Sequence, residues 1–147
     1  MRSAAGALGL AVEVVERPEA NSLEEAASVL GLRPDDIVKS LVVKRHDGGF
    51  LFALIPGDRQ IAWPKLRAAV GVNKLQMPPA DEALAATGYE RGTITPIGAA
   101  GSWPVFADVS IVGRRVAMGA GAHGYSAFVD ADALITAYGA TVAEIAT

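Results

Sequence analysis

The sequence predicts a single α+β domain, with surrounding helices and a mixed, largely antiparallel sheet that closes in a barrel-like way. Apolar β-branched runs cluster as hairpins, and the helical segments are short and bounded by proline or glycine. Strands and helices do not alternate in the regular β-α-β order of a parallel sheet. With 147 residues, 51% of them hydrophobic, residues 1–147 are expected to form one domain with a well-filled core.

The first elements carry clear local signals. Residues 12–16 alternate between apolar and polar side chains and predict a short strand that ends before Pro18. Ser22 and Glu25 form a capping box at the start of a helix, and Gly31 supplies its end. A strand and a helix therefore precede the central part of the chain.

A lysine interrupts the most apolar part of the chain. Residues 36–44 predict a strand buried on both faces, and the turn at 47–49 leads into a second apolar run at 50–55, which makes a central hairpin. Lys39 lies inside the first strand. Because an unpaired buried ammonium is costly, Lys39 is expected to reach the rim, to find a carboxylate, or to lie in a pocket for an anionic ligand.

The second half of the chain predicts three more helices, each introduced by proline or aspartate and ended by glycine: residues 65–70, 81–86 and 132–138. Residues 88–98 contain glycines and a proline at positions typical of a structured loop. Strands are predicted at 105–112, 115–118 and 127–129, with a tight turn at Gly113 and Arg114 between the first two.

Composition excludes several classes of function. The net charge of −3 argues against a general polyanion binder, so contact with nucleic acid has to be local. The absence of cysteine excludes disulfides and thiol chemistry, and His46 and His123 match no metal-ligand spacing, so we expect neither metal nor cofactor. No run approaches the ~18 apolar residues of a membrane span, and a cytoplasmic protein is expected.

One glycine-rich segment, residues 119–124, carries the pattern of a nucleotide-binding turn. Gly119 to Gly124 matches the dinucleotide-binding pattern G-x-G-x-x-G. That site requires a helix starting within the glycines, whereas residues 125–129 predict an extended segment, and too little chain follows for a nucleotide-binding fold. A glycine turn whose backbone approaches a ligand is the better interpretation.

An ordered set of short motifs then becomes specific. The chain contains Glu24-Glu25-Ala26-Ala27, Val38-Lys39-Ser40-Leu41, Ile55-Pro56-Gly57-Asp58, Thr87-Gly88-Tyr89 and Gly92-Thr93-Ile94-Thr95-Pro96-Ile97-Gly98, followed by Asp108 and the Gly121 turn. In this it resembles the YbaK family of aminoacyl-tRNA deacylases, which also appears as the editing insertion of bacterial prolyl-tRNA synthetases. The resemblance covers roughly residues 10 to 146.

The resemblance implies a site. The family's key lysine, in a strand Lys-Ser or Lys-Thr pair, matches Lys39 as the catalytic residue, and the family's G-x-x-x-P loop matches Gly92 to Pro96. The residues implied in substrate binding are Ser40, Gly92, Thr93, Ile94, Thr95, Pro96, Gly98, Asp108, Gly119, Gly121 and His123. Gly119, His123 and Ser126 depart from the pattern of the cysteine-specific branch, which leaves the aminoacyl group open.

The implied activity is hydrolysis, in trans, of the ester of mischarged aminoacyl-tRNA. No histidine or carboxylate pair is placed as a general base, so the terminal ribose hydroxyl of the tRNA is the candidate that assists the water. The tRNA acceptor end is the expected partner, contacted by a local basic set, and an aminoacyl-tRNA synthetase is a second candidate. The alternative is a catalytically silent module of the same fold that binds tRNA or a synthetase. The basic set comprises Lys39, Lys44, Arg45 and Lys74.

Overall fold

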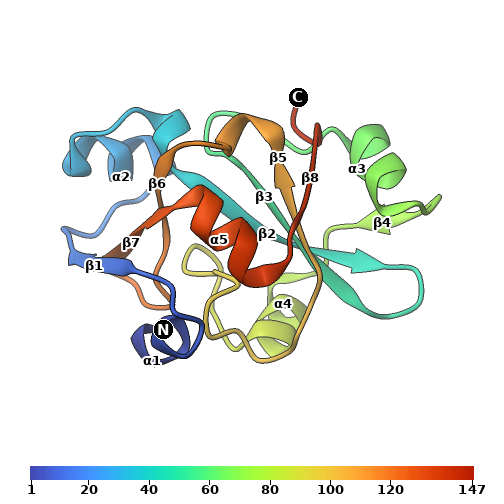
Figure 1. The fold of residues 1–147 in the computed structure, drawn as a ribbon, viewed down its shortest axis with the longest axis horizontal. Helices are drawn as coiled ribbons and strands as arrows, with labels where there is room; N and C mark the ends of the chain where they lie inside the picture. Colours follow the sequence, from blue (N-terminus) through green and yellow to red (C-terminus); the bar gives the residue numbers. More distant parts are fainter.

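Two β-sheets form the framework of the structure, a computed structural model that describes residues 1–147 (Figure 1). The strands are β1 (Val12–Glu16), β2 (Val38–Arg45), β3 (Phe50–Pro56), β4 (Leu75–Gln76), β5 (Val105–Asp108), β6 (Arg115–Gly119), β7 (Tyr125–Asp130) and β8 (Thr141–Ala143). The helices are α1 (Arg2–Ala7), α2 (Leu23–Leu30), α3 (Trp63–Val70), α4 (Ala80–Thr87) and α5 (Ala131–Tyr138), with 3₁₀ turns η1 (Pro34–Asp36) and η2 (Val109–Ile111). The α+β class is confirmed.

The larger sheet has five strands in the order β4-β2-β3-β5-β8. β2 and β3 form the predicted antiparallel hairpin at its centre, and Lys39 pairs with Ile55. β5 lies parallel to β3, and β8 lies parallel to β5. The sheet is therefore mixed, as the sequence predicts.

The smaller sheet has three antiparallel strands in the order β1-β7-β6. A single bridge between Ile37 and Ala117 joins the entrance of β2 to β6. The hydrogen-bonded ladders thus form two open sheets, and the predicted barrel-like closure is not confirmed.

The predicted strand over residues 105–112 is wrong in its second half. β5 ends at Asp108, and the 3₁₀ turn η2 follows. The side chain of Asp108 accepts hydrogen bonds from the backbone N–H of Ser110, at 3.1 Å, and from its hydroxyl. Because this local capping stops the strand, the chain crosses to the other sheet before β6 begins.

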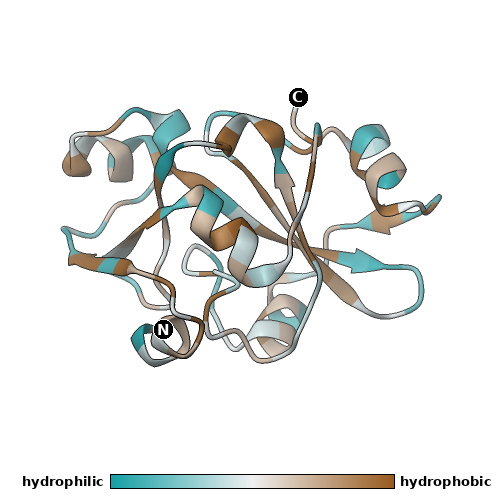
Figure 2. Ribbon diagram, viewed as in Figure 1, coloured by the Kyte–Doolittle hydropathy of each residue, from teal (hydrophilic) through white to brown (hydrophobic).

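The core has two parts, one on each face of the larger sheet. Along β3, Phe52 and Leu54 pack toward the smaller sheet, whereas Leu51, Ala53 and Ile55 pack toward α3 and the C-terminal segment. Figure 2 shows this concentration of hydrophobic residues along the central strands. The hairpin is therefore buried on both faces, as predicted, and it fixes the position of the β2 residues beside it.

Local capping explains the helices. The Ser22 side chain accepts a hydrogen bond from the backbone N–H of Glu25 at 3.1 Å, and Gly31 ends α2 in the left-handed conformation. The other three predicted helices are also present. Their ends lie within one residue of the predicted ends, except that α3 begins two residues earlier, at Trp63. The sequence did not predict α1, β4 or β8. No helix has both the length and the apolar composition to cross a membrane.

Candidate functional site

The main cavity lies where the two sheets meet. It has a volume of about 460 Å³ and is bounded by the N-terminus of α2, the start of β2, the loop at Gly92 and the ends of β6 and β7 that flank their turn. Five of the residues implied by the sequence line it: Lys39, Ser40, Gly92, Ile94 and Gly119. Segments far apart in the chain therefore meet at one place.

Lys39 is the second residue of β2 and is partly buried at the cavity. Its ammonium donates a hydrogen bond to the backbone carbonyl of Arg59, and no carboxylate lies within ion-pair distance. Burial lowers the pKa of Lys39 below its ordinary value, and the negative charges of Asp58 and Glu24 oppose that shift. Lys39 thus lines the cavity without a carboxylate partner, and its role toward an anionic ligand stays a prediction.

Ser40 contributes an unsatisfied hydroxyl. Its Oγ is buried and has no hydrogen-bond partner, and it is the sole buried side-chain nitrogen or oxygen in this condition. Leaving such a group unpaired costs roughly 1–3 kcal/mol. Ser40 follows Lys39 in β2 and is among the residues that line the cavity, and a ligand is one explanation for a buried hydroxyl without a partner.

The two glycine segments pack backbone against backbone. A Cβ atom added to Gly119 would lie 2.5 Å from the carbonyl oxygen of Ile94 and 2.8 Å from that of Thr93, so only glycine fits there. The N–H of Gly121, whose φ is +82°, donates to the Thr93 carbonyl at 2.9 Å. The loop that carries Gly92 and Ile94 is thus held against the β6–β7 turn.

Side chains behind the loop fix its shape. The Tyr89 hydroxyl donates to the carbonyl of Ile97 at 2.6 Å, and the Tyr138 hydroxyl donates to that of Pro96 at 3.1 Å. Thr95 is buried, and its hydroxyl oxygen accepts from the Ile97 N–H at 3.3 Å. These contacts give the loop a defined backbone before any ligand binds.

Several implied residues do not line the cavity: Thr93, Thr95, Pro96, Gly98, Asp108, Gly121 and His123. Thr93, Thr95, Pro96, Gly98 and Gly121 belong to the loop and turn just described. Asp108 is only 1% exposed, and one of its oxygens accepts from the N–H groups of Ile145 and Ala146, both at 2.9 Å. The ring of His123 pairs with Glu90 at 3.0 Å on the surface.

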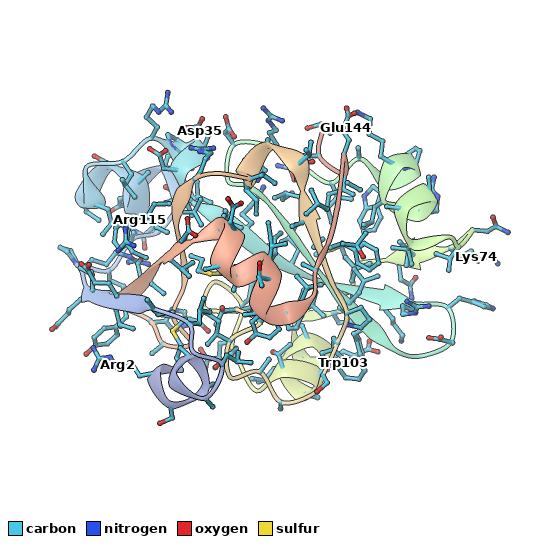
Figure 3. All side chains as sticks on the ribbon, viewed as in Figure 1. Arg2, Asp35, Lys74, Trp103, Arg115 and Glu144 are labelled. Atoms are coloured by element: carbon cyan, nitrogen blue, oxygen red, sulfur yellow. The ribbon has the colours of Figure 1, made fainter.

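The predicted basic set is divided in space. Lys44, Arg45 and Lys74 line a second hollow of about 310 Å³, separate from the cavity at Lys39. Lys44 pairs with Glu82 at 2.6 Å and Arg45 pairs with Asp47 at 3.6 Å. Figure 3 shows Lys74 projecting from the end of the molecule opposite α2.

Arginines that the sequence analysis missed line the main cavity. Arg17 follows β1, and Arg91 precedes Gly92. Together with Lys39 they give the cavity three cations, and no aspartate, glutamate or histidine lines it. The place of Arg91 at the cavity could have been predicted, because it directly precedes the Gly92 motif. The place of Arg17 could not, because it depends on the pairing of β1 with β7.

The arrangement suits an anionic, partly apolar ligand. Unpaired cations around a cavity attract phosphate or carboxylate groups, and Val38, Ile94 and Met118 add apolar surface. No group of three or more histidine, aspartate or glutamate side chains lies close enough together to hold a metal ion. The three cations of the cavity can supply charge stabilisation and hydrogen bonds.

Comparison with known proteins defines the class. Residues 17–137 match the sequence model of the aminoacyl-tRNA editing domain, and the chain belongs to that family. Among curated relatives, the proline–tRNA ligase of Thermosipho africanus is 42% identical over 88 residues, which cover 60% of this chain and 16% of the ligase. That of Shouchella clausii is 38% identical over 109 residues, which cover 74% of this chain and 19% of the ligase. The chain therefore spans less than a fifth of either ligase.

Solved structures share the whole fold. A protein described as a candidate trans-editing enzyme for prolyl tRNA synthetase superimposes with a TM-score of 0.91 at 26% identity, over 99% of this chain and 94% of that one. A hypothetical protein superimposes with a TM-score of 0.93, also at 26% identity, over 99% and 98% of the two chains. Proteins of about this length with this fold therefore exist outside the ligases.

Proposed function

We propose that this protein hydrolyses the ester bond between an amino acid and tRNA, acting in trans as one domain over residues 1–147. The observation that carries the proposal is the cavity lined by Lys39, Ser40, Gly92 and Gly119, together with the Ser40 hydroxyl that has no partner within the protein. Membership of the aminoacyl-tRNA editing family supports the same conclusion. The acceptor end of the tRNA is the proposed ligand, and a synthetase is a second candidate partner.

Lys39 supplies positive charge to the reacting end of the substrate. An ammonium has three N–H donors, so the contact with the Arg59 carbonyl leaves two for a substrate oxygen. Charge placed in advance beside the ester stabilises the negative oxygen that develops when water attacks the carbonyl carbon. The Ser40 hydroxyl gains a partner when the substrate enters, which removes the cost of leaving it unpaired.

The substrate provides the proton acceptor in this mechanism. No histidine or carboxylate lines the cavity, so the free hydroxyl of the terminal ribose orients the attacking water. The oxygen of the water bonds to the carbonyl carbon, and the bond between that carbon and the ribose oxygen breaks. The amino acid leaves as a carboxylic acid, and the proton lost by the water passes by way of the free hydroxyl to the ribose oxygen.

The relatives suggest the tRNA. Because they are proline–tRNA ligases, tRNA for proline is the proposed substrate, charged with an amino acid other than proline. Ile94 and Met118 line the apolar part of the cavity and limit the size of the aminoacyl side chain. Such a second site is useful because one methylene gives a synthetase only about 1–3 kcal/mol of discrimination.

One assay tests the proposal. The protein is incubated with tRNA for proline charged separately with alanine, cysteine, serine or proline, and loss of the ester is followed over time. We expect hydrolysis of at least one mischarged form and much slower hydrolysis of the prolyl form. RNA binding without any ester loss would favour the catalytically silent module instead.

A further inference from the structure

We propose that Arg17, held in place by Ser126, binds a backbone phosphate of the single-stranded 3′ end of the tRNA. The inference takes its ligand from the proposed function and adds a binding residue that neither the sequence motifs nor the family match assigns. It depends on how Arg17 is held, on its charge environment and on its position.

The guanidinium of Arg17 is oriented by neutral acceptors. Its Nε donates to the hydroxyl of Ser126 at 2.9 Å, and Nη1 donates to the carbonyl of Pro18 at 3.0 Å. The backbone N–H of Arg17 donates to the carbonyl of Gly124, also at 2.9 Å. These contacts fix the side chain at the cavity but do not cancel its charge.

The cations that line the cavity have no carboxylate partners. Aspartate and glutamate outnumber lysine and arginine by 16 to 13, and Arg33, Arg45, Arg114 and Arg115 all have a carboxylate within 4.0 Å. Arg17, Lys39 and Arg91 have none, and the same is true of four cations that do not line the cavity: Arg2, Arg59, Arg67 and Lys74. All three cations of the cavity are thus unpaired. That arrangement favours an anion supplied by a ligand.

The position of Arg17 in the cavity indicates that it contacts a phosphate and not the ester. Lys39 and Ser40 lie on β2, whereas Arg17 and Ser126 belong to the β1–β7 side of the cavity. Ser126 is only 6% exposed, so its hydroxyl is a fixed support and not a mobile surface group. If the ester lies at Lys39 and the RNA strand leading to it passes the β1–β7 side, the free N–H groups of the Arg17 guanidinium donate to a phosphate oxygen there.

The test uses binding alone. The probe is an uncharged RNA hairpin ending in single-stranded CCA, prepared with natural phosphates or with one neutral methylphosphonate at each CCA linkage in turn. Three variants are compared with the wild type: Arg17→Gln, Ser126→Asp, which places a carboxylate beside Arg17, and Arg2→Gln. Arg2 is an exposed arginine on α1 that does not line the cavity (Figure 3), and its replacement changes the net charge by the same amount as Arg17→Gln.

We expect Arg17→Gln and Ser126→Asp to weaken binding about tenfold or more, and Arg2→Gln to have little effect. A plot of the logarithm of the binding constant against the logarithm of the salt concentration should be shallower for Arg17→Gln than for the wild type. The expected difference in slope is roughly 0.7, the value for one phosphate of a single strand. One methylphosphonate should abolish the difference between wild type and Arg17→Gln, because both then lack the contact.

The inference is overturned if Arg17→Gln binds as tightly as Arg2→Gln, or if the wild type binds no hairpin. It is also overturned if Arg17→Gln weakens binding by the same factor for the natural hairpin and for every methylphosphonate hairpin. Thermal melts of each variant verify folding, and Ser126→Asp retains the guanidinium. Arg17-dependent binding without ester hydrolysis would refute the proposed function and leave the phosphate contact standing. If the ester is hydrolysed and neither hydrolysis nor binding depends on Arg17, the phosphate contact is refuted and the proposed function stands.

Discussion

Gly119→Ala tests whether contact between the two glycine segments shapes the site. The added Cβ would lie 2.5 Å from the carbonyl oxygen of Ile94, and ordinary contact begins near 3.4 Å. The difference between 3.4 and 2.5 Å requires the loop or the strand to move by about 0.9 Å. Neither moves easily, because the neighbouring Thr93 carbonyl is bonded to Gly121 and the loop is held behind by tyrosine hydroxyls.

The displacement predicts separate effects on activity and on stability. A misplacement of about 1 Å in a catalytic arrangement costs on the order of a hundredfold in rate. Overpacking costs roughly 1–3 kcal/mol, which lowers the Tm of a chain of this size by about 3–10 °C. Single-turnover deacylation well below the Tm should therefore show a large loss in folded protein.

Gly6→Ala is the matched control. Gly6 lies in α1, and a Cβ there meets nothing within 4 Å. Alanine also favours a helix over glycine by about 1 kcal/mol, so this variant should be fully active and at least as stable as the wild type. If Gly119→Ala retains the activity of Gly6→Ala, the loop does not set the catalytic geometry and the reasoning fails.

Other predictions follow from single side chains. Lys39→Ala should lower the rate of deacylation ten- to a hundredfold or more, because charge-assisted contacts to the substrate are lost. It should change the free energy of unfolding by less than about 1 kcal/mol, because no carboxylate is left unpaired. A variant that melts much earlier but keeps its turnover would contradict this. Ile94→Ala should extend hydrolysis to larger aminoacyl groups, and an unchanged substrate profile would exclude the role. For Asp108, burial raises the pKa, but hydrogen bonds from Ser110, Ile145 and Ala146 outweigh burial and lower it overall. Its stabilisation is therefore present above roughly pH 4 and lost as pH falls through the folded-state pKa, so Asp108→Asn should melt earlier at pH 7 and approach the wild type at low pH.

The sequence predicted the elements whose signals are local. The Ser22 capping box and the glycines after each helix act within one turn of the chain, so they can be recognised without the fold. The short strands β4 and β8 exist only because other strands pair with them. The end of β5 depends partly on Asp108, which also bonds a backbone 37 residues later. No local pattern carries that information.

The candidate site divides in the same way. Lys39, Ser40 and the loop from Gly92 belong to contiguous motifs and were named from the sequence. Arg17 lacks such a motif, because it reaches the cavity through the register that pairs Glu16 with Tyr125 and so brings it beside Ser126. The placement of one sheet against the other decides which cations surround the cavity.

This division bears on the proposed binding of RNA, because the protein itself carries a net charge of −3. Its carboxylates pair with cations elsewhere, as in Lys44 with Glu82 and Lys65 with Glu144, so the hollow at Lys44 is partly neutralised. None of the three cavity cations has a carboxylate within ion-pair distance. A few unpaired charges in a concave, partly apolar site attract a phosphate more effectively than the same charges spread over a surface. Because repulsion from the remaining acidic surface opposes any longer RNA contact, the acceptor end alone should account for most of the affinity. A CCA-ended hairpin should then bind within a few-fold of full-length tRNA, and a much tighter affinity for full-length tRNA would show that a second surface participates.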